Sequence, residues 1–259
     1  MTGAALSGIV TYLDALLRTS DTPDYPHALN GLQMEHRGPV TRIAAAVDTS
    51  ARTIRGAIAD RSNLLLVHHG LFWGGLQPIT GPLYSRIALL LEHDIALYST
   101  HLPLDAHETF GNSALLAAEI GLEPTGGFAR FDTVHCGVRG SADVATADLL
   151  ARLQQFARSH GGDAISSTME PSRRTRKWAI CSGAGINAGS IREATDLGVD
   201  TLITGEGPHW SAVDAEERAL VIIYAGHYAT ETLGVRALAK HVSARFDIPW
   251  AFIESPTGL

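Results

Sequence analysis

Short apolar runs alternate with amphipathic segments along almost the whole chain, and this alternation constrains the fold more than any other feature. The apolar runs are rich in branched aliphatic residues and end at glycine or polar residues, as buried strands do. The segments between them repeat apolar residues at helical spacing. Strands that alternate with helices predict an α/β fold, with a layered α/β/α arrangement and a largely parallel sheet.

The expected elements can be placed along the chain from this pattern. Strands are predicted near 43–47, 64–67, 95–100, 133–139, 177–181, 201–204, 220–224 and 250–253. Helices are predicted near 6–17, 51–60, 84–93, 112–120, 146–160, 188–197, 210–218 and 230–243. The stretch 123–132 contains Pro124, Gly126 and Gly127 and is the best candidate for an internal boundary. It separates two similar α/β halves, 1–125 and 133–259.

Composition excludes several classes of protein. The chain has 259 residues, of which 45% are apolar and 18% charged, which is ordinary for a globular protein. A net charge of −7 argues against general binding to nucleic acid or to acidic membranes. Every apolar run is far shorter than the ~20 residues needed to span a bilayer. The one basic cluster, 173–177, is interpreted as a solvated loop, with a phosphate contact as the alternative.

Cysteine usage and the first residues predict a cytoplasmic protein. Cys136 and Cys181 are the two cysteines of the chain, and they are too far apart in sequence to form a C-x-x-C pair. Such usage is typical of a reducing compartment and leaves no thiolate cage for a metal. The N-terminal residues lack the basic segment that begins a signal peptide.

Histidines cluster where predicted strands end. His68 and His69 follow the apolar run 64–67, and His101 follows the next strand. In open α/β sheets, ligands bind beyond the carboxyl ends of the strands. Neighbouring residues of a strand point to opposite faces, so both histidines can serve one site only if the chain turns there, which Gly70 would allow.

Two carboxylates accompany these histidines. Asp105 lies four residues after His101, and Pro103 between them favours a structured loop over a helix. His227 and Glu231 stand four apart at the start of a predicted helix and share one face of it. Each pair has an ordinary structural explanation when it is taken alone. The histidine pair could cap a strand end, His101 and Asp105 could lie in a surface loop, and His227 and Glu231 could be a surface pair. Together they supply nitrogen and oxygen ligands that suit divalent Zn, Mn, Fe, Co or Ni.

Four motifs together resemble those of the Nif-like family of dinuclear metal-centre hexameric proteins, which is related to Ngg-interacting factor three. Many members are labelled GTP cyclohydrolase I type 2 homologues. The motifs are VHHGLFW at 67–73, HLPLDAH at 101–107, TGE at 204–206 and GHYATE at 226–231. The chain resembles the short form, which lacks an inserted domain. It departs from many relatives in having Gly70, where they have proline, and this alters loop stiffness rather than ligand chemistry.

The resemblance implies a site for two divalent transition-metal ions between the halves. It implies the metal ligands His68, His69, Asp105, His227 and Glu231. Glu231 would bridge the two ions, while His101 beside the site would carry protons. Glu206 and His209 could line the pocket. The alternative is that they belong to an ordinary turn at the end of a strand. The resemblance also implies a ring-shaped homohexamer.

A rival motif lies at 182–188, where G-x-G-x-x-A follows a predicted strand and opens a helix. Gly183 and Gly185 are therefore candidate cofactor-binding residues, and Glu206 follows at the distance expected of a dinucleotide fingerprint. Backbone amides at a helix N-terminus bind any anion. The loop could hold a nicotinamide cofactor, form a phosphate or carboxylate pocket for the metal site, or be ordinary turn chemistry.

These observations favour a metal-dependent hydrolase. A pair of ions activates water at neutral pH, and His101 or Glu206 could pass protons to the leaving group. The expected substrate is a small phosphorylated or nucleotide-like molecule, with a GTP cyclohydrolase type of reaction by family analogy. The alternatives are a non-catalytic metal-handling or partner-binding ring, and an NAD-type oxidoreductase.

Overall fold

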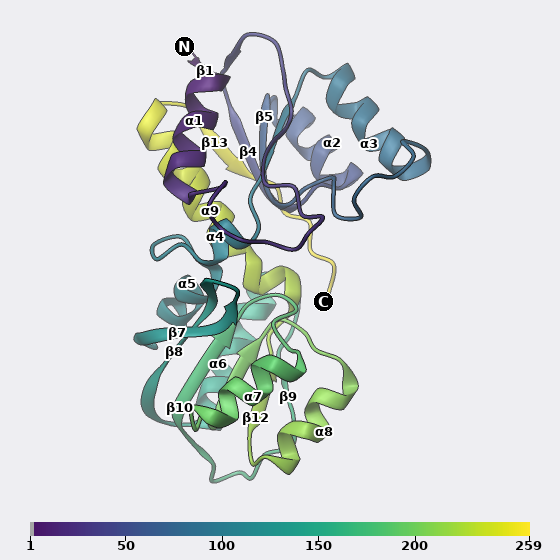
Figure 1. Ribbon diagram of the computed structural model, residues 1–259. Coiled ribbons are helices and arrows are strands. Elements are labelled where there is room, and N and C mark those ends of the chain that lie inside the picture. The colour runs from purple at the N-terminus through teal and green to yellow at the C-terminus, as the bar shows by residue number, and fades with distance from the viewer. Residues whose placement is uncertain (1–2) are drawn as a thin grey trace. The chain divides into compact units, whose positions relative to one another are not determined.

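A computed structural model describes residues 3–259 and divides the chain into two compact units (Figure 1). Unit 1 takes the residues up to His107 together with Gly234–Ser255. Unit 2 takes Glu108–Leu233 and Pro256–Leu259. Each unit has its own sheet and its own apolar core.

Unit 1 is built on a five-stranded sheet in the order β13-β4-β5-β6-β2, in which β2 is the antiparallel strand. Its strands are β1 (Ala4–Ala5), β2 (Gly31–Met34), β3 (Pro39–Val40), β4 (Ile43–Asp48), β5 (Leu64–His69), β6 (Ala96–Ser99) and β13 (Trp250–Phe252). Its helices are α1 (Leu6–Leu17), α2 (Ala51–Asp60), α3 (Gly81–Glu92), α4 (Leu102–Asp105) and most of α9 (His227–Phe246). The short β1 and β3 pair with each other.

Helices cover both faces of this sheet, with α1 and α9 on one side and α2 and α3 on the other (Figure 1). On the α2 and α3 side, Ile54 and Leu90 pack against Leu65 and Leu97 of the central strands. The strands are buried on both faces, so they carry continuous apolar runs rather than alternating ones. Ser50 caps α2, because its side chain accepts a hydrogen bond from the amide of Thr53.

Unit 2 is built on a mixed sheet in the order β7-β8-β10-β11-β12-β9, in which β10, β11 and β12 are parallel. Its strands are β7 (Pro124–Phe131), β8 (Val134–Ala145), β9 (Ile165–Ser166), β10 (Arg174–Cys181), β11 (Thr201–Thr204) and β12 (Val221–Tyr224). Its helices are α5 (Asn112–Glu119), α6 (Thr146–Ser159), α7 (Ala188–Asp196) and α8 (His209–Glu217), with the first turns of α9.

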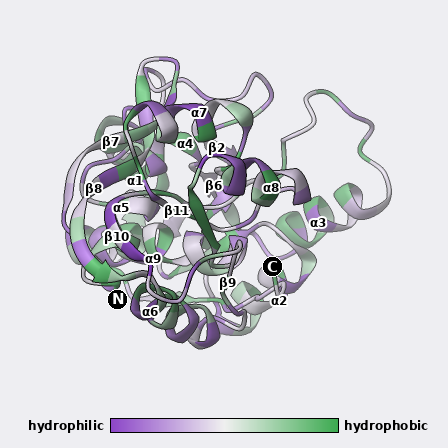
Figure 2. Ribbon diagram, turned by 90° about the horizontal axis from the view of Figure 1, so that it is seen from below, coloured by the Kyte–Doolittle hydropathy of each residue, from purple (hydrophilic) through white to green (hydrophobic). Residues whose placement is uncertain are grey.

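The apolar core of unit 2 lies on both faces of its sheet. Leu116 of α5 and Leu153 of α6 pack with Trp178 of β10 on one face. Ile191 of α7 and Ala215 of α8 belong to a separate cluster. The helices carry hydrophilic as well as hydrophobic residues in Figure 2, as expected where one side of a helix meets a core. The predicted α/β fold with layered helices is therefore confirmed, but the largely parallel sheet is found only in unit 1, since β7, β8 and β9 pair antiparallel in unit 2.

Three sequence expectations differ from the structure. The predicted boundary at 123–132 falls within β7, because this segment pairs with β8 as a hairpin, and the C-terminal β13 returns to pair with β4 of unit 1. The chain does not turn at the histidine pair, because β5 stays hydrogen-bonded to β4 as far as His69, yet the two rings lie 4.7 Å apart at the end of the strand, so no turn is needed. The loop expected at Pro103 is the single turn α4, since proline fits the first turn of a helix, where no amide hydrogen is needed.

Among residues 3–259, the structure has no helix that combines the length and the apolar character needed to cross a membrane.

Candidate metal centre

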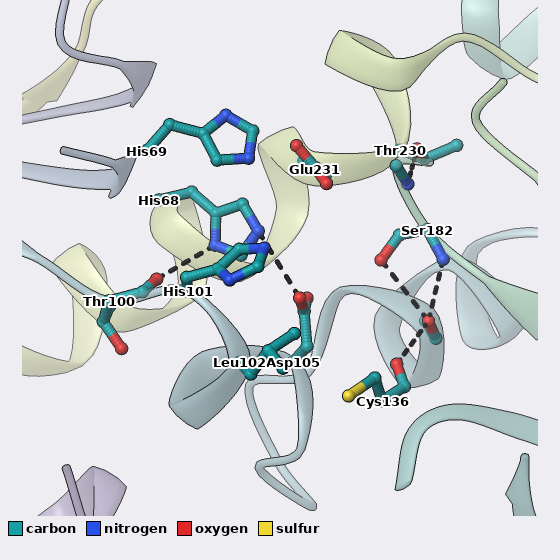
Figure 3. A network of polar contacts seen from close by, with 12 residues as sticks. His68, His69, Thr100, His101, Leu102, Asp105, Cys136, Ser182, Thr230 and Glu231 are labelled. Atoms are coloured by element: carbon teal, nitrogen blue, oxygen red, sulfur yellow. Dashed lines mark hydrogen bonds and ion pairs between the residues drawn. The ribbon is translucent and has the colours of Figure 1, made fainter. Parts of the chain in front are cut away.

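Three histidines of unit 1 converge at the carboxyl edge of its sheet (Figure 3). His68 and His69 end β5, and His101 follows β6, which is the parallel neighbour of β5. One ring nitrogen from each histidine lies within 4.8 Å of the other two. The sequence predicts that neighbouring strand ends bring these imidazoles together, and the order of the strands in the sheet has this effect.

Each of the three rings is held through Nδ1 by an oxygen atom. The Nδ1 contacts are His68 to the Thr100 carbonyl at 2.9 Å, His69 to Asp48 Oδ1 at 2.8 Å, and His101 to Asp24 Oδ1 at 2.8 Å. Carbonyl and carboxylate oxygens only accept hydrogen bonds, so Nδ1 carries the hydrogen in each ring. This leaves the lone pair of each neutral ring on Nε2, and this is the arrangement found in metal-ligating histidines.

Asp24 is the most heavily bonded of these supporting groups. Its Oδ1 accepts from the amide of Tyr25 at 2.7 Å and from His101, and its Oδ2 accepts from Asn30 Nδ2 at 2.8 Å and from the amide of Leu102 at 3.0 Å. Burial raises the pKa of a carboxyl group, but the hydrogen bonds from His101 and Asn30 outweigh it, and the pKa of Asp24 lies below its usual value. Asp24 is therefore an anion that fixes both the ring of His101 and the start of α4.

Asp105 joins this cluster from α4. Its Oδ2 lies 3.4 Å from Nε2 of His68, and the His68 side chain is completely buried. The single turn of α4 places Asp105 one helical turn beyond His101. Unit 1 thus brings together three imidazoles and one carboxylate, all of them singled out by the sequence.

Unit 2 carries a second group of donors on the first turns of α9. Nε2 of His227 lies 3.0 Å from Oε2 of Glu231, which is 3% exposed. Nδ1 of His227 lies 2.8 Å from Oε1 of Glu206, which follows β11. Glu206 therefore orients His227 in the way that Asp48 orients His69.

The electrostatics of this second group favour a positive charge. Burial alone would lower the pKa of His227, but the hydrogen bonds and charges of Glu231 and Glu206 outweigh burial and raise the pKa of His227 to about 9. At neutral pH the ring is then a cation held between two carboxylates. A bound metal ion would likewise compensate the negative charge of the two carboxylates.

Gly183 makes room for this group. Its φ is +61°, and a Cβ added there would lie 2.0 Å from Oε1 of Glu231 and 3.3 Å from Nε2 of His227. Its amide donates to Oγ1 of Thr230 at 3.0 Å, so the loop is tied to α9 (Figure 3). The glycine that opens the fingerprint-like motif thus lies against the predicted metal ligands.

The rest of that motif is occupied by contacts within the chain. A Cβ on Gly185 would lie 2.6 Å from Sγ of Cys181, so this glycine allows close packing. Asn187 caps α7 by accepting from the amides of Gly189 at 2.8 Å and Ser190 at 3.0 Å. The amides that a phosphate would use in a dinucleotide site are therefore engaged by a side chain. Cofactor binding by Gly183 and Gly185 stays a prediction.

Most of the basic cluster at 173–177 lies in β10 rather than in the solvated loop that the sequence predicts, and two of its arginines contact neighbouring residues. Arg173 donates to the carbonyls of Asp200 at 2.8 Å and Ala219 at 2.6 Å. Arg174 pairs with the carboxylate of Asp143 at 2.6 Å. These contacts agree with a structural role for the cluster rather than with a phosphate contact.

The fold and these donors define a class: an α/β protein of two units, each with histidine and carboxylate donors at the ends of its strands. The chain belongs to the DUF34/NIF3 (NGG1p interacting factor 3) family, whose model matches residues 4–257.

Curated relatives and solved structures agree with this assignment. A GTP cyclohydrolase 1 type 2 homolog of Deinococcus radiodurans is 40% identical over 257 residues, covering 97% of this chain and 93% of the relative. One of the same name from Pyrococcus abyssi is 39% identical, covering 97% and 98%. Protein ybgI, described as of unknown function, superposes with a TM-score of 0.87 at 32% identity, covering 98% and 99%. The protein TTHA1606 from Thermus thermophilus gives 0.84 at 38% identity, with the same coverage.

Proposed function

We propose that the two donor groups serve one centre of two divalent transition-metal ions. The ligands would be His68, His69, Asp105, His227 and Glu231, with Glu231 shared between the ions. The observation that carries the proposal is the fixing of His68 and His69 through Nδ1 by oxygen acceptors, with Oδ2 of Asp105 lying 3.4 Å from Nε2 of His68. The rings are held in the tautomer that binds metal before any metal arrives.

The chemistry of the donors fits such a centre. Imidazole and carboxylate ligands suit divalent Zn, Mn, Fe, Co and Ni. A structural site is usually closed by four protein ligands to one ion, whereas five ligands divided over two ions leave positions for water or substrate. This difference favours catalysis.

We propose further that the protein is a hydrolase for a small phosphorylated or nucleotide-like substrate, a class to which the name of its relatives also points. Two bound ions supply an activated water at neutral pH and polarise a substrate oxygen. His101 would carry a proton at Nε2 from the attacking water to the leaving group, because the anionic Asp24 at Nδ1 stabilises the charged ring that forms between the two transfers. Asp48 and Glu206 keep His69 and His227 in position.

Replacing His101 by alanine tests this division of roles. The variant should retain its metal and lose hydrolysis by about 10²–10⁴-fold, the usual contribution of a general base. Purified protein loaded with each metal is screened against GTP and small phosphate esters, with metal content measured on the same samples. His93→Ala removes an exposed histidine at the end of α3 and is the matched control.

Two results would change the assignment. A His101→Ala protein that loses metal as completely as His68→Ala would make His101 a ligand and remove it as the proton carrier. Full metal uptake with no hydrolysis of any substrate would favour metal handling over catalysis. Assembly as a homohexamer and a cytoplasmic location stay predictions.

A further inference from the structure

We propose that Trp73 and Tyr25 form an aromatic platform that binds the planar, base-like ring of the substrate beside the histidines of unit 1. The proposal rests on the proposed function in one respect, since it assumes that this histidine cluster meets a small-molecule ligand. It goes further in naming the part of the ligand that is recognised and the residues that recognise it.

Two aromatic side chains border the histidine cluster without belonging to the core. The ring of Trp73 lies 4.6 Å from that of His101 at 82°, and 5.3 Å from that of His69 at 65°. The ring of Tyr25 lies 6.0 Å from that of His101. Trp73 is 36% exposed and Tyr25 is 53% exposed. Large exposed aromatics next to a polar cluster mark a surface where a ligand can gain contact area.

Contacts made by the two residues before Trp73 hold its loop in position. The amide of Leu71 donates to Oε1 of Gln33 at 2.7 Å, and the amide of Leu29 donates to the carbonyl of Phe72 at 3.4 Å. A Cβ on Gly70 would lie 2.3 Å from Nε2 of Gln33, so glycine lets this side chain cross the backbone just before Trp73.

Tyr25 is linked to His101 through Asp24. Its amide donates to Oδ1 of Asp24 at 2.7 Å, and the same oxygen accepts from Nδ1 of His101. The backbone at each of the two aromatic residues is therefore held near His101 by independent contacts. A platform that is already fixed loses little conformational entropy when a flat ligand stacks on it.

The chemistry of this surface selects a ring rather than a phosphate. The side chains that support it, Gln33 and Asp24, are neutral or anionic and offer no positive charge to a phosphate. Aromatic side chains stack on any nucleobase, since every base has a flat π-face. A ring held here would place polar atoms at its edge close to the Nε2 atoms of the cluster.

Binding of guanosine 5′-monophosphate and of ribose 5-phosphate, measured by calorimetry, tests the platform. The two probes share the sugar phosphate, and only the first has a base. Guanosine 5′-monophosphate should bind, and Trp73→Ala should weaken it by about 5–150-fold, the range for loss of one stacking side chain. Tyr25→Ala should weaken it by a smaller factor. Ribose 5-phosphate should bind more weakly and should not respond to either substitution.

Two control variants separate stacking from general damage. Trp73→Phe keeps a ring and should bind guanosine 5′-monophosphate within about threefold of the parent. Trp210→Ala removes a tryptophan that is 44% exposed on α8 of unit 2 and should change nothing. Metal content is measured in every variant, so that a loss of metal is not mistaken for a loss of stacking.

The outcomes for the platform and for the hydrolase are distinct. Binding that depends on Trp73 in a protein with no hydrolytic activity would support the platform and count against the hydrolase. The platform is overturned if guanosine 5′-monophosphate does not bind, if Trp73→Ala binds it as tightly as the parent, or if both probes respond equally.

Discussion

Replacing Glu231 by alanine should strip both metal ions from the protein. Glu231 is buried, its Oε2 contacts the ring of His227, and its Oε1 lies against Gly183. If the two oxygens serve different ions, one substitution removes a ligand from each. Metal content per chain, measured by elemental mass spectrometry after supplementation, should fall from about two ions to near zero in a two-metal site.

Two comparison variants distinguish a bridging ligand from a ligand to one ion and from a carboxylate outside the site. Glu216→Ala removes an exposed carboxylate of α8 and should keep the full metal content. His69→Ala should lose mainly one ion, because an imidazole serves a single metal. The bridging role is contradicted if Glu231→Ala retains as much metal as His69→Ala, and the ligand role is contradicted if it retains as much as the parent.

Replacing Gly183 by alanine should weaken metal binding although Gly183 is not itself a ligand. The added Cβ would lie 2.0 Å from Oε1 of Glu231, so the carboxylate must move. Disturbing the groups that orient a metal ligand costs about 10–100-fold in affinity, and we expect a loss in this range. Metal affinity is measured by competition with a chromogenic chelator.

Gly81→Ala is a matched control for this experiment. Gly81 has a φ of +56°, close to that of Gly183, and a Cβ added there meets no atom of the described chain within 4 Å. Both variants carry the same backbone cost of roughly 1–2 kcal/mol for a left-handed alanine. Only Gly183→Ala should affect the metal, and equal affinities in the two variants would show that Gly183 does not position Glu231.

Local sequence patterns predicted the elements of this fold well. The strand predicted at 201–204 is β11 as observed, and the helix predicted at 51–60 is α2, with its cap at Ser50. These elements depend on apolar runs and capping chemistry, which are local properties of the chain. The strand ends then brought His68, His69 and His101 together, as expected of neighbouring parallel strands.

The groups that support the site could not be predicted in the same way. Asp24 and Asp48 belong to no motif, and each contacts a histidine that is distant in sequence. Their roles depend on how the loops of unit 1 fold against the sheet, which apolar periodicity does not encode. Pro103 favours a loop in a sequence-based prediction, but it lies in the first turn of α4, where a proline does not exclude a helix.

Gly183 shows that one local motif can fit two different uses. Its sequence context matches a dinucleotide fingerprint, yet its lack of a side chain lets Glu231 and His227 approach the backbone. A glycine serves close approach to a phosphate or to a carboxylate equally well. Only the packing of α9 against this loop distinguishes the two uses.

The central claim, that the chain holds two metal ions, is tested most directly by the metal content of the parent protein. The purified chain is supplemented with Zn, Mn or Fe, freed of loosely bound ions, and analysed by elemental mass spectrometry together with protein concentration. We expect about two transition-metal ions per chain, as in other two-metal sites. A value near zero, with no uptake of any of the three metals, would contradict the account.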